Sequence, residues 1–218
     1  MKTANKENEH LKKQLYELMK KFDELKLDSW EKVQAYDKRM ANVYIELANK
    51  IQPLKLSNHN NIAVLGSVSV GKSTIVNSLI GKKSAEVGAG ETTTKTSVYK
   101  GNGLYVYDVF GKNDEKTYMT PDCICDLKSV EKRLLVVTST VKDISKFARF
   151  LDELNLSYAI VFNKFDLIDQ EEQEQLRKQI GNEVKDLELK CCKKVYFLSG
   201  KHPGKFEDWN KMVTHLRE

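Results

Sequence analysis

Hydrophobic positions near the start of the chain recur with a helical period. Spacings of four, three, four and three residues separate Leu11, Leu15, Leu18, Phe22 and Leu25. This heptad seam predicts a helix over about residues 5–26.

A second apolar face follows and predicts another helix. It runs from Trp30 to Ile51, and Pro53 ends it. Asp28 and Glu31 have the spacing of a capping box at its start. The polar stretch after Pro53 predicts a linker, so we divide the chain into an N-terminal helical arm, residues 1–56, and a second domain, residues 57–218.

Two interpretations of the arm are open. Its apolar faces either pack within the chain, on the second domain or as a hairpin, or they pair with another copy or a partner. We favour packing for the second helix. Two heptads are too few to establish a coiled coil for the first.

Beyond the linker, short apolar runs alternate with amphipathic stretches. The alternation predicts an α/β fold with a doubly wound, mostly parallel six-stranded sheet, preceded by the helical arm. Ligands of such sheets bind at the carboxyl ends of the strands. A mobile polar segment is predicted over 112–128. The predicted strands are 62–65, the end of 87–100, 104–107, 133–138, 157–162 and 194–198, and the predicted helices begin near 72, 143, 171 and 206.

Composition excludes several classes of protein. Apolar residues are 40% of the 218, which is enough for a real core. The net charge of +5 is interspersed, so nucleic-acid binding is not indicated. No apolar run approaches the roughly 18 residues of a membrane span, and membrane association is not indicated. The four cysteines lack zinc-site spacings and the N-terminus lacks a signal-peptide core, so we expect reduced thiols and a cytoplasmic location.

The first strand of the second domain leads into a glycine-bounded loop and then a helix. Residues 66–73 read GSVSVGKS, which fits the phosphate-binding pattern G-x-x-x-x-G-K-[ST]. The two glycines let successive N–H groups point at phosphate oxygens, and the helix adds the positive end of its dipole. Lys72 supplies a mobile charge for the β- and γ-phosphates, and the Ser73 hydroxyl suits Mg²⁺. The predicted phosphate-binding residues are Gly66, Ser67, Val68, Ser69, Val70, Gly71, Lys72, Ser73 and Thr74.

Two later strand ends carry further motifs. Asp108-x-x-Gly111 follows a hairpin, where an acidic residue can hold Mg²⁺ through water and a glycine N–H can reach a γ-phosphate. Asn163-Lys164-Phe165-Asp166 ends the strand 157–162. Asp166 can accept two hydrogen bonds from guanine that adenine does not offer, while Asn163 braces the loops and the stem of Lys164 lies on the base.

The last strand ends in Ser199-Gly200-Lys201. This loop can offer a backbone N–H to guanine O6. All four motifs fall at the predicted carboxyl edge of the sheet, so the sequence predicts a guanine-nucleotide site that binds GTP or GDP with Mg²⁺.

The four motifs in this order resemble the GTP-binding domain of the translation-factor-related P-loop GTPases, over about residues 60–218. The phosphate loop and the stretch VGAGETT look like those of dynamin-like and immunity-related GTPases, and Era-like GTPases match nearly as well. The resemblance implies that Thr93, flanked by Thr92 and Thr94, ligates Mg²⁺ with Ser73 and Asp108. It also implies catalytic roles for Lys72, Ser69 and Thr93.

Two departures from the family pattern bear on activity. Phe110 stands where the family carries proline, and Lys112 stands where Ras-like proteins carry a catalytic glutamine. We therefore expect slow GTP hydrolysis, switch segments over 84–97 and 109–122, and a nucleotide-dependent homodimer or protein effector. The alternatives are a nucleotide-gated interaction module with little or no hydrolysis, and an Era-like GTPase switch.

Overall fold

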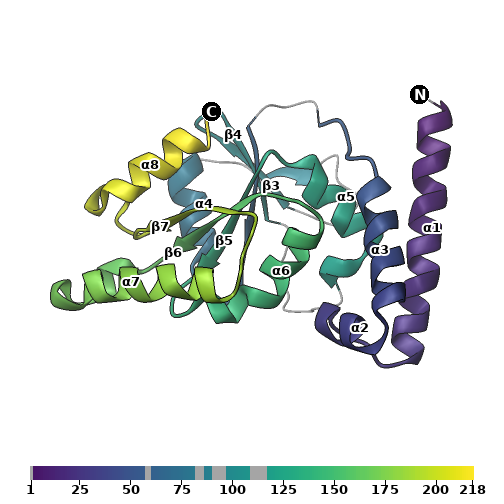
Figure 1. Cartoon of the computed structure of the whole chain (residues 1–218). Helices are drawn as coiled ribbons and strands as arrows, with labels where there is room; N and C mark the ends of the chain where they lie inside the picture. Colours follow the sequence, from purple (N-terminus) through teal and green to yellow (C-terminus); the bar gives the residue numbers. More distant parts are fainter. Residues whose placement is uncertain (1, 57–59, 82–85, 90–96, 109–116) are drawn as a thin grey trace.

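The computed structural model describes residues 2–56, 60–81, 86–89, 97–108 and 117–218 (Figure 1). Its centre is a mixed sheet with the strand order β2-β3-β4-β1-β5-β6-β7. β4, β1, β5, β6 and β7 run parallel, and β2 and β3 pair antiparallel at one edge. The strands are β1 (Asn61–Leu65), β2 (Glu86–Ala89), β3 (Ser97–Gly101), β4 (Leu104–Asp108), β5 (Lys132–Val137), β6 (Tyr158–Phe162) and β7 (Cys192–Phe197).

The predicted α/β class and the mostly parallel sheet are confirmed, and all six predicted strands are present. β2 is an additional strand at the start of the stretch 84–97, where we predicted a switch segment and no strand. Backbone pairing holds it on β3, with Glu86 opposite Tyr99 and Ala89 opposite Ser97. Side-chain patterns do not report such an edge strand, because its stability comes from main-chain hydrogen bonds.

Helices cover both faces of the sheet (Figure 1). Along a central strand, alternate side chains lie on opposite faces of the sheet. In β1, Ile62 and Val64 belong to one buried cluster, and Ala63 and Leu65 belong to the other. α4 (Lys72–Ile80) and α8 (Glu207–His215) cover the first face, and α5 (Pro121–Ser129), α6 (Ser145–Glu153) and α7 (Gln170–Asp186) cover the second.

The N-terminal arm forms an outer layer against α5 and α6 (Figure 1). It consists of α1 (Lys2–Glu24), α2 (Trp30–Tyr36) and α3 (Lys38–Lys50). The predicted second helix is therefore two helices. Asp37 ends α2 and starts α3, because its carboxylate accepts hydrogen bonds from the backbone N–H groups of Arg39 and Met40. The cap of α2 is Ser29 rather than Asp28, since the Ser29 hydroxyl accepts from the N–H of Lys32.

The heptad seam of α1 packs inside the chain. Leu15 and Phe22 are buried, whereas Leu25 is 41% exposed. Phe22 and Trp30 contact the ring of Tyr44 in α3, with centroids 5.5 and 5.7 Å away, and the Tyr44 hydroxyl donates to the Met119 carbonyl. The packing interpretation thus accounts for the seam, and a coiled coil with a second chain is not supported.

α5 replaces most of the polar segment predicted over 112–128. Thr120 caps this helix and Pro121 occupies its first turn. Its inner face is fully buried at Cys123, Ile124 and Leu127. The polar residues misled the prediction because Asp122 and Lys128 form hydrogen bonds with the arm, which a local pattern does not reveal.

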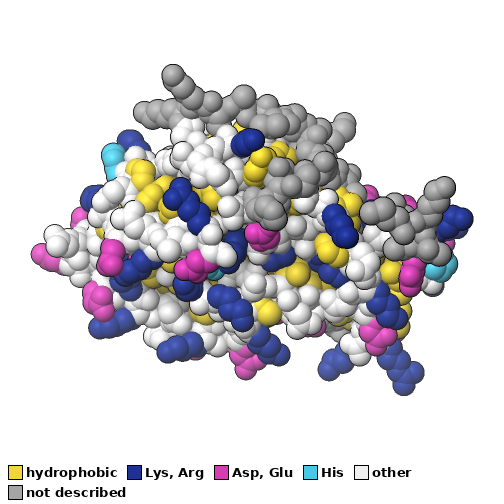
Figure 2. Space-filling model, turned by 90° about the horizontal axis from the view of Figure 1, so that it is seen from above, with side chains coloured by type: hydrophobic (Ala, Val, Ile, Leu, Met, Phe, Trp, Pro, Cys, Tyr) yellow, Lys and Arg dark blue, Asp and Glu magenta, His cyan; other side chains and the backbone are white. Residues whose placement is uncertain are grey.

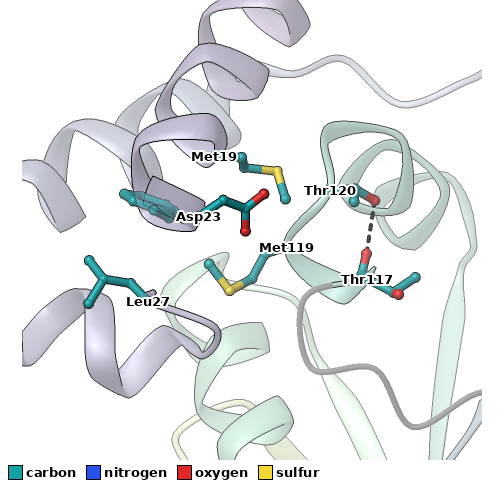
Figure 3. A pocket seen from close by; sticks show the side chains of 7 residues that line it. Met19, Asp23, Leu27, Thr117, Met119 and Thr120 are labelled. Carbon is teal, nitrogen blue, oxygen red and sulfur yellow. Dashed lines mark hydrogen bonds between the residues drawn. The ribbon is translucent and has the colours of Figure 1, made fainter. Parts of the chain in front are cut away.

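A small pocket of about 180 Å³ lies between α1 and the start of α5. α1 and the residues just after it provide Met19, Phe22, Asp23 and Leu27. The turn η1 (Thr117–Met119) and Thr120 provide the other side. In Figure 3 the Asp23 carboxylate lies between the thioethers of Met19 and Met119. Of the helices in the described ranges, none has the length and apolar character needed to span a membrane.

Candidate functional site

The phosphate loop, residues 66–73, connects β1 to α4 at the carboxyl edge of the sheet. Gly66 has φ 144°, and a Cβ there would lie 2.5 Å from the Val136 carbonyl oxygen of β5. Gly71 has φ 89°, and its Cβ would collide with the Asn163 amide. Both positions therefore require glycine for backbone conformation and for close approach of neighbouring loops.

Lys72 opens α4 and is 9% exposed. Its ammonium group donates to the carbonyl oxygens of Gly66 and Ser67, at 2.9 and 2.8 Å. The loop thus keeps the positive charge at the positive end of the α4 dipole, where anions bind best.

The remaining residues of the phosphate loop divide by exposure. Val70 is buried, and Ser67 is half-buried. Val68 and Ser69 are exposed at the tip, where Ser69 has φ 68°. Ser73 and Thr74 are exposed in the first turn of α4, beside the loop.

Asn163 connects its own motif to the phosphate loop and the final loop through hydrogen bonds. Its side-chain Nδ2 donates to the Val70 carbonyl at 2.8 Å, and its Oδ1 accepts from the Gly200 N–H at 2.8 Å. Lys164 adds a second link, because its ammonium donates to the Ser69 carbonyl at 2.9 Å. The phosphate loop, the base-recognition loop (residues 163–166) and the final loop (residues 199–201) therefore meet.

Two further hydrogen bonds hold the final loop in place. The Ser199 hydroxyl accepts from the N–H of His202 at 3.1 Å, and Ser78 donates to the Gly200 carbonyl at 2.6 Å. Lys201 is exposed. Asn163 already accepts the Gly200 N–H, so this amide is not the one that the predicted contact to guanine O6 requires.

Asp166 lies in the turn η3 (Phe165–Leu167), and its side chain is 12% exposed. The His202 Nε2 atom is 4.0 Å from its carboxylate. Sequence reasoning assigned no role to this histidine, and no motif signals it. The sheet brings the two together because β6 and β7 are neighbours.

The predicted Mg²⁺ ligands are only partly described. Asp108 ends β4 next to β1, and Ser73 follows β1, so both belong to the same edge of the sheet. Their oxygen atoms are the donors that Mg²⁺ prefers. Thr92, Thr93, Thr94 and Gly111 lie outside the described residues, as do Phe110 and Lys112. Within the described ranges no three His, Cys, Asp or Glu side chains form a metal cluster.

Comparison with known proteins shows a similarity to GTPases in both sequence and fold. Residues 61–164 match the family described as 50S ribosome-binding GTPase. SsGBP in complex with GDP has a TM-score of 0.52 and 17% identity, and the match covers 99% of this chain and 69% of that one. The translation elongation factor SelB of Methanococcus maripaludis has a TM-score of 0.50 and 17% identity, over 76% of this chain and 34% of SelB. The fold is that of a P-loop GTPase domain.

Curated relatives narrow the relationship. GTPase Der of Thermodesulfovibrio yellowstonii is 29% identical over 164 residues, which are 65% of this chain and 37% of Der. GTPase Era of Fusobacterium nucleatum is 29% identical over 154 residues, 64% of this chain and 50% of Era. The chain spans about a third to a half of the length of these relatives. Over about two thirds of its length, the chain is thus similar to the GTPases Der and Era.

The resemblance to dynamin-like and immunity-related GTPases is not supported by these matches. It rested on the phosphate loop, on the stretch VGAGETT and on the helices that precede the second domain. The similarity to Der and Era extends over 65% and 64% of the chain and carries more weight.

Proposed function

We propose that this chain is a Mg²⁺-dependent GTPase switch of the Era-like type, which hydrolyses GTP slowly to GDP and phosphate. The observation that carries the proposal is the Asn163 bridge. Its amide links the phosphate loop to the final loop, and it directly precedes the residues suited to recognise guanine. Phosphate and base recognition thus belong to one site.

Each group in the proposed site has a separate role. Lys72 pairs with the β- and γ-phosphates, and the amides of residues 67–74 surround the phosphate oxygens. Asp166 accepts from the guanine ring N–H and amino group, and the stem of Lys164 covers the base. Ser73, Asp108 and Thr93 would hold Mg²⁺, which neutralises charge that develops on the phosphate oxygens.

Slow hydrolysis follows from the residue at position 112. Lysine replaces the glutamine that orients the attacking water in Ras-like proteins, so rate enhancement would depend on a partner. Phe110 and Lys112 also favour a second candidate, a nucleotide-gated interaction module with little or no hydrolysis. Phosphate release measured over a range of protein concentrations separates the two, since turnover near zero at every concentration identifies the module.

Lys72→Ala tests the proposed site. The variant should bind GTP and GDP roughly 10- to 100-fold more weakly, because it loses charge-assisted hydrogen bonds to the phosphates. Titration calorimetry with Mg²⁺ measures the loss, and circular dichroism checks the fold. Lys142→Ala, an exposed lysine after β5, should bind like the wild type. Normal affinity in Lys72→Ala, or equal competition by ATP, would refute the proposal.

A further inference from the structure

The turn that carries Asp166 has one deeply buried anchor. Phe165 is 0% exposed, whereas the following Leu167 is 73% exposed and the preceding Lys164 faces solvent. The Phe165 N–H donates to the Leu198 carbonyl at 3.1 Å. Because Lys164 and Leu167 are exposed and Phe165 is buried, the position of the Asp166 carboxylate depends on how the Phe165 ring is held.

An aromatic cluster surrounds that ring. Phe197 and Phe206 each lie 5.2 Å from it between centroids, and Phe162 lies 6.0 Å away. Packing of this kind keeps the ring within the cluster, but hydrophobic attraction is non-directional and does not by itself define the orientation of the ring.

Arg177 of α7 adds a directional contact. Its Cζ atom lies 4.8 Å from the centroid of Phe165 and 4.5 Å from that of Phe197. A planar cation over aromatic faces is attracted by the ring quadrupole, and a guanidinium is suited to stacking in this way.

Asp208 holds Arg177 in place. Its Oδ2 atom accepts from Arg177 Nη1 at 3.0 Å and from the Phe197 N–H at 3.0 Å. Asp208 lies in the first turn of α8, where a negative charge is favourable. The guanidinium is therefore fixed between a carboxylate on one side and two rings on the other.

We propose that Arg177 is a positioning residue for guanine recognition. Held by Asp208, it fixes the Phe165 ring, and through this ring it sets the orientation of the Asp166 carboxylate. Among the contacts of the described residues, Arg177 touches none of the side chains predicted to bind the nucleotide. The inference rests on the proposed function, because it assumes that Asp166 contacts the base.

A comparison of the affinities for GDP and IDP isolates the effect of Arg177 on the orientation of the Asp166 carboxylate. Hypoxanthine has the ring N–H of guanine but lacks its amino group, so only guanine needs both carboxylate oxygens aligned. A less rigid turn should therefore weaken the binding of GDP more than the binding of IDP. The ratio of the two affinities reports alignment and does not depend on the fraction of folded protein.

The experiment uses the full chain with Mg²⁺ and measures Kd for GDP and IDP by calorimetry. Arg177→Met keeps the aliphatic stem and removes the cation. It should weaken GDP roughly three- to thirtyfold and lower the GDP preference over IDP at least about threefold. Arg177→Lys should be intermediate, because it retains a charge without the planar fork.

Lys178→Met is the matched control. Lys178 is the next residue of α7, its side chain is 73% exposed, and it pairs only with Glu174 at 3.6 Å among the described contacts. This variant should retain both the GDP affinity and the ratio of the wild type.

The outcomes are distinct. A wild type that does not prefer GDP to IDP contradicts the proposed function. In another outcome, the wild type prefers GDP while Arg177→Met melts at a lower temperature and keeps the full ratio of GDP to IDP affinity. Arg177 is then a purely structural residue, and the inference is overturned. If Arg177→Met does not fold, Arg177→Lys decides in the same way.

Discussion

Asn163 is the residue at which three loops meet. Its amide contacts Val70 and Gly200, which are 93 and 37 positions away in the chain. The sequence motif predicted that Asn163 holds the edge of the base and braces the loops. The identity of its partners came only from the fold.

Asp166→Asn tests base recognition at a single residue. The change replaces one acceptor oxygen with an NH₂ donor, which faces the guanine amino group unfavourably but matches the 2-carbonyl of xanthine. GDP affinity should fall about 100-fold or more, and XDP should bind better than GDP.

Competition binding with GDP and XDP measures this change of preference. Asp186→Asn, at the exposed end of α7, serves as the control and should keep the preference for GDP. Retained preference for GDP in Asp166→Asn would show that another group recognises the base.

At the scale of elements, α5 is attached to the arm at both ends. At its start, Asp122 accepts from Lys12 at 2.9 Å and from Tyr16 at 2.7 Å. At its end, the Ser129 hydroxyl accepts from the Leu54 N–H at 2.7 Å. These contacts explain why a polar segment forms a stable helix. The division of the chain into an N-terminal helical arm, residues 1–56, and a second domain, residues 57–218, stays a prediction.

Lys128 provides the strongest link between α5 and α3. Its ammonium donates to the carbonyl oxygens of Ala48, Asn49 and Ile51, at 3.2, 2.8 and 2.6 Å. Burial lowers the pKa of this lysine, while the negative end of the α3 dipole favours its charge.

Lys128→Met should lower the free energy of unfolding by about 2 kcal/mol, because the last carbonyls of α3 lose a charged donor. Urea unfolding measures the change. Lys20→Met, at an exposed position of α1, should stay within about 0.5 kcal/mol of the wild type. Equal stability of the two variants would mean that the C-terminus of α3 needs no cap from α5.

At the scale of the whole molecule, the surface carries interspersed charges. Figure 2 shows basic and acidic side chains mixed over the face seen from above. The exposed large apolar side chains of the described residues are scattered over several elements; they are Tyr16, Leu25, Tyr36, Val43, Val68 and Leu167. A stable homodimer buries about 800 Å² per partner around an apolar centre, and this scatter does not favour one.

Sedimentation with GDP and with a non-hydrolysable GTP analogue tests the assembly. We expect a monomer of 25.0 kDa in both states, which would assign the switch to a different protein partner. A dimer that forms only with the analogue and Mg²⁺ would contradict this expectation and place the partner surface over the nucleotide.

The sequence by itself determined the α/β class, the six predicted strands and the positions of the phosphate and base-recognition loops. It did so because hydrophobic period and glycine-bounded motifs are local properties of the chain. Tertiary structure alone decided the edge strand β2, the break of the arm at Asp37 and the docking of α5. It also decided the contact between Arg177 and Phe165. These features depend on backbone pairing and on side chains far apart in sequence, which local patterns do not encode.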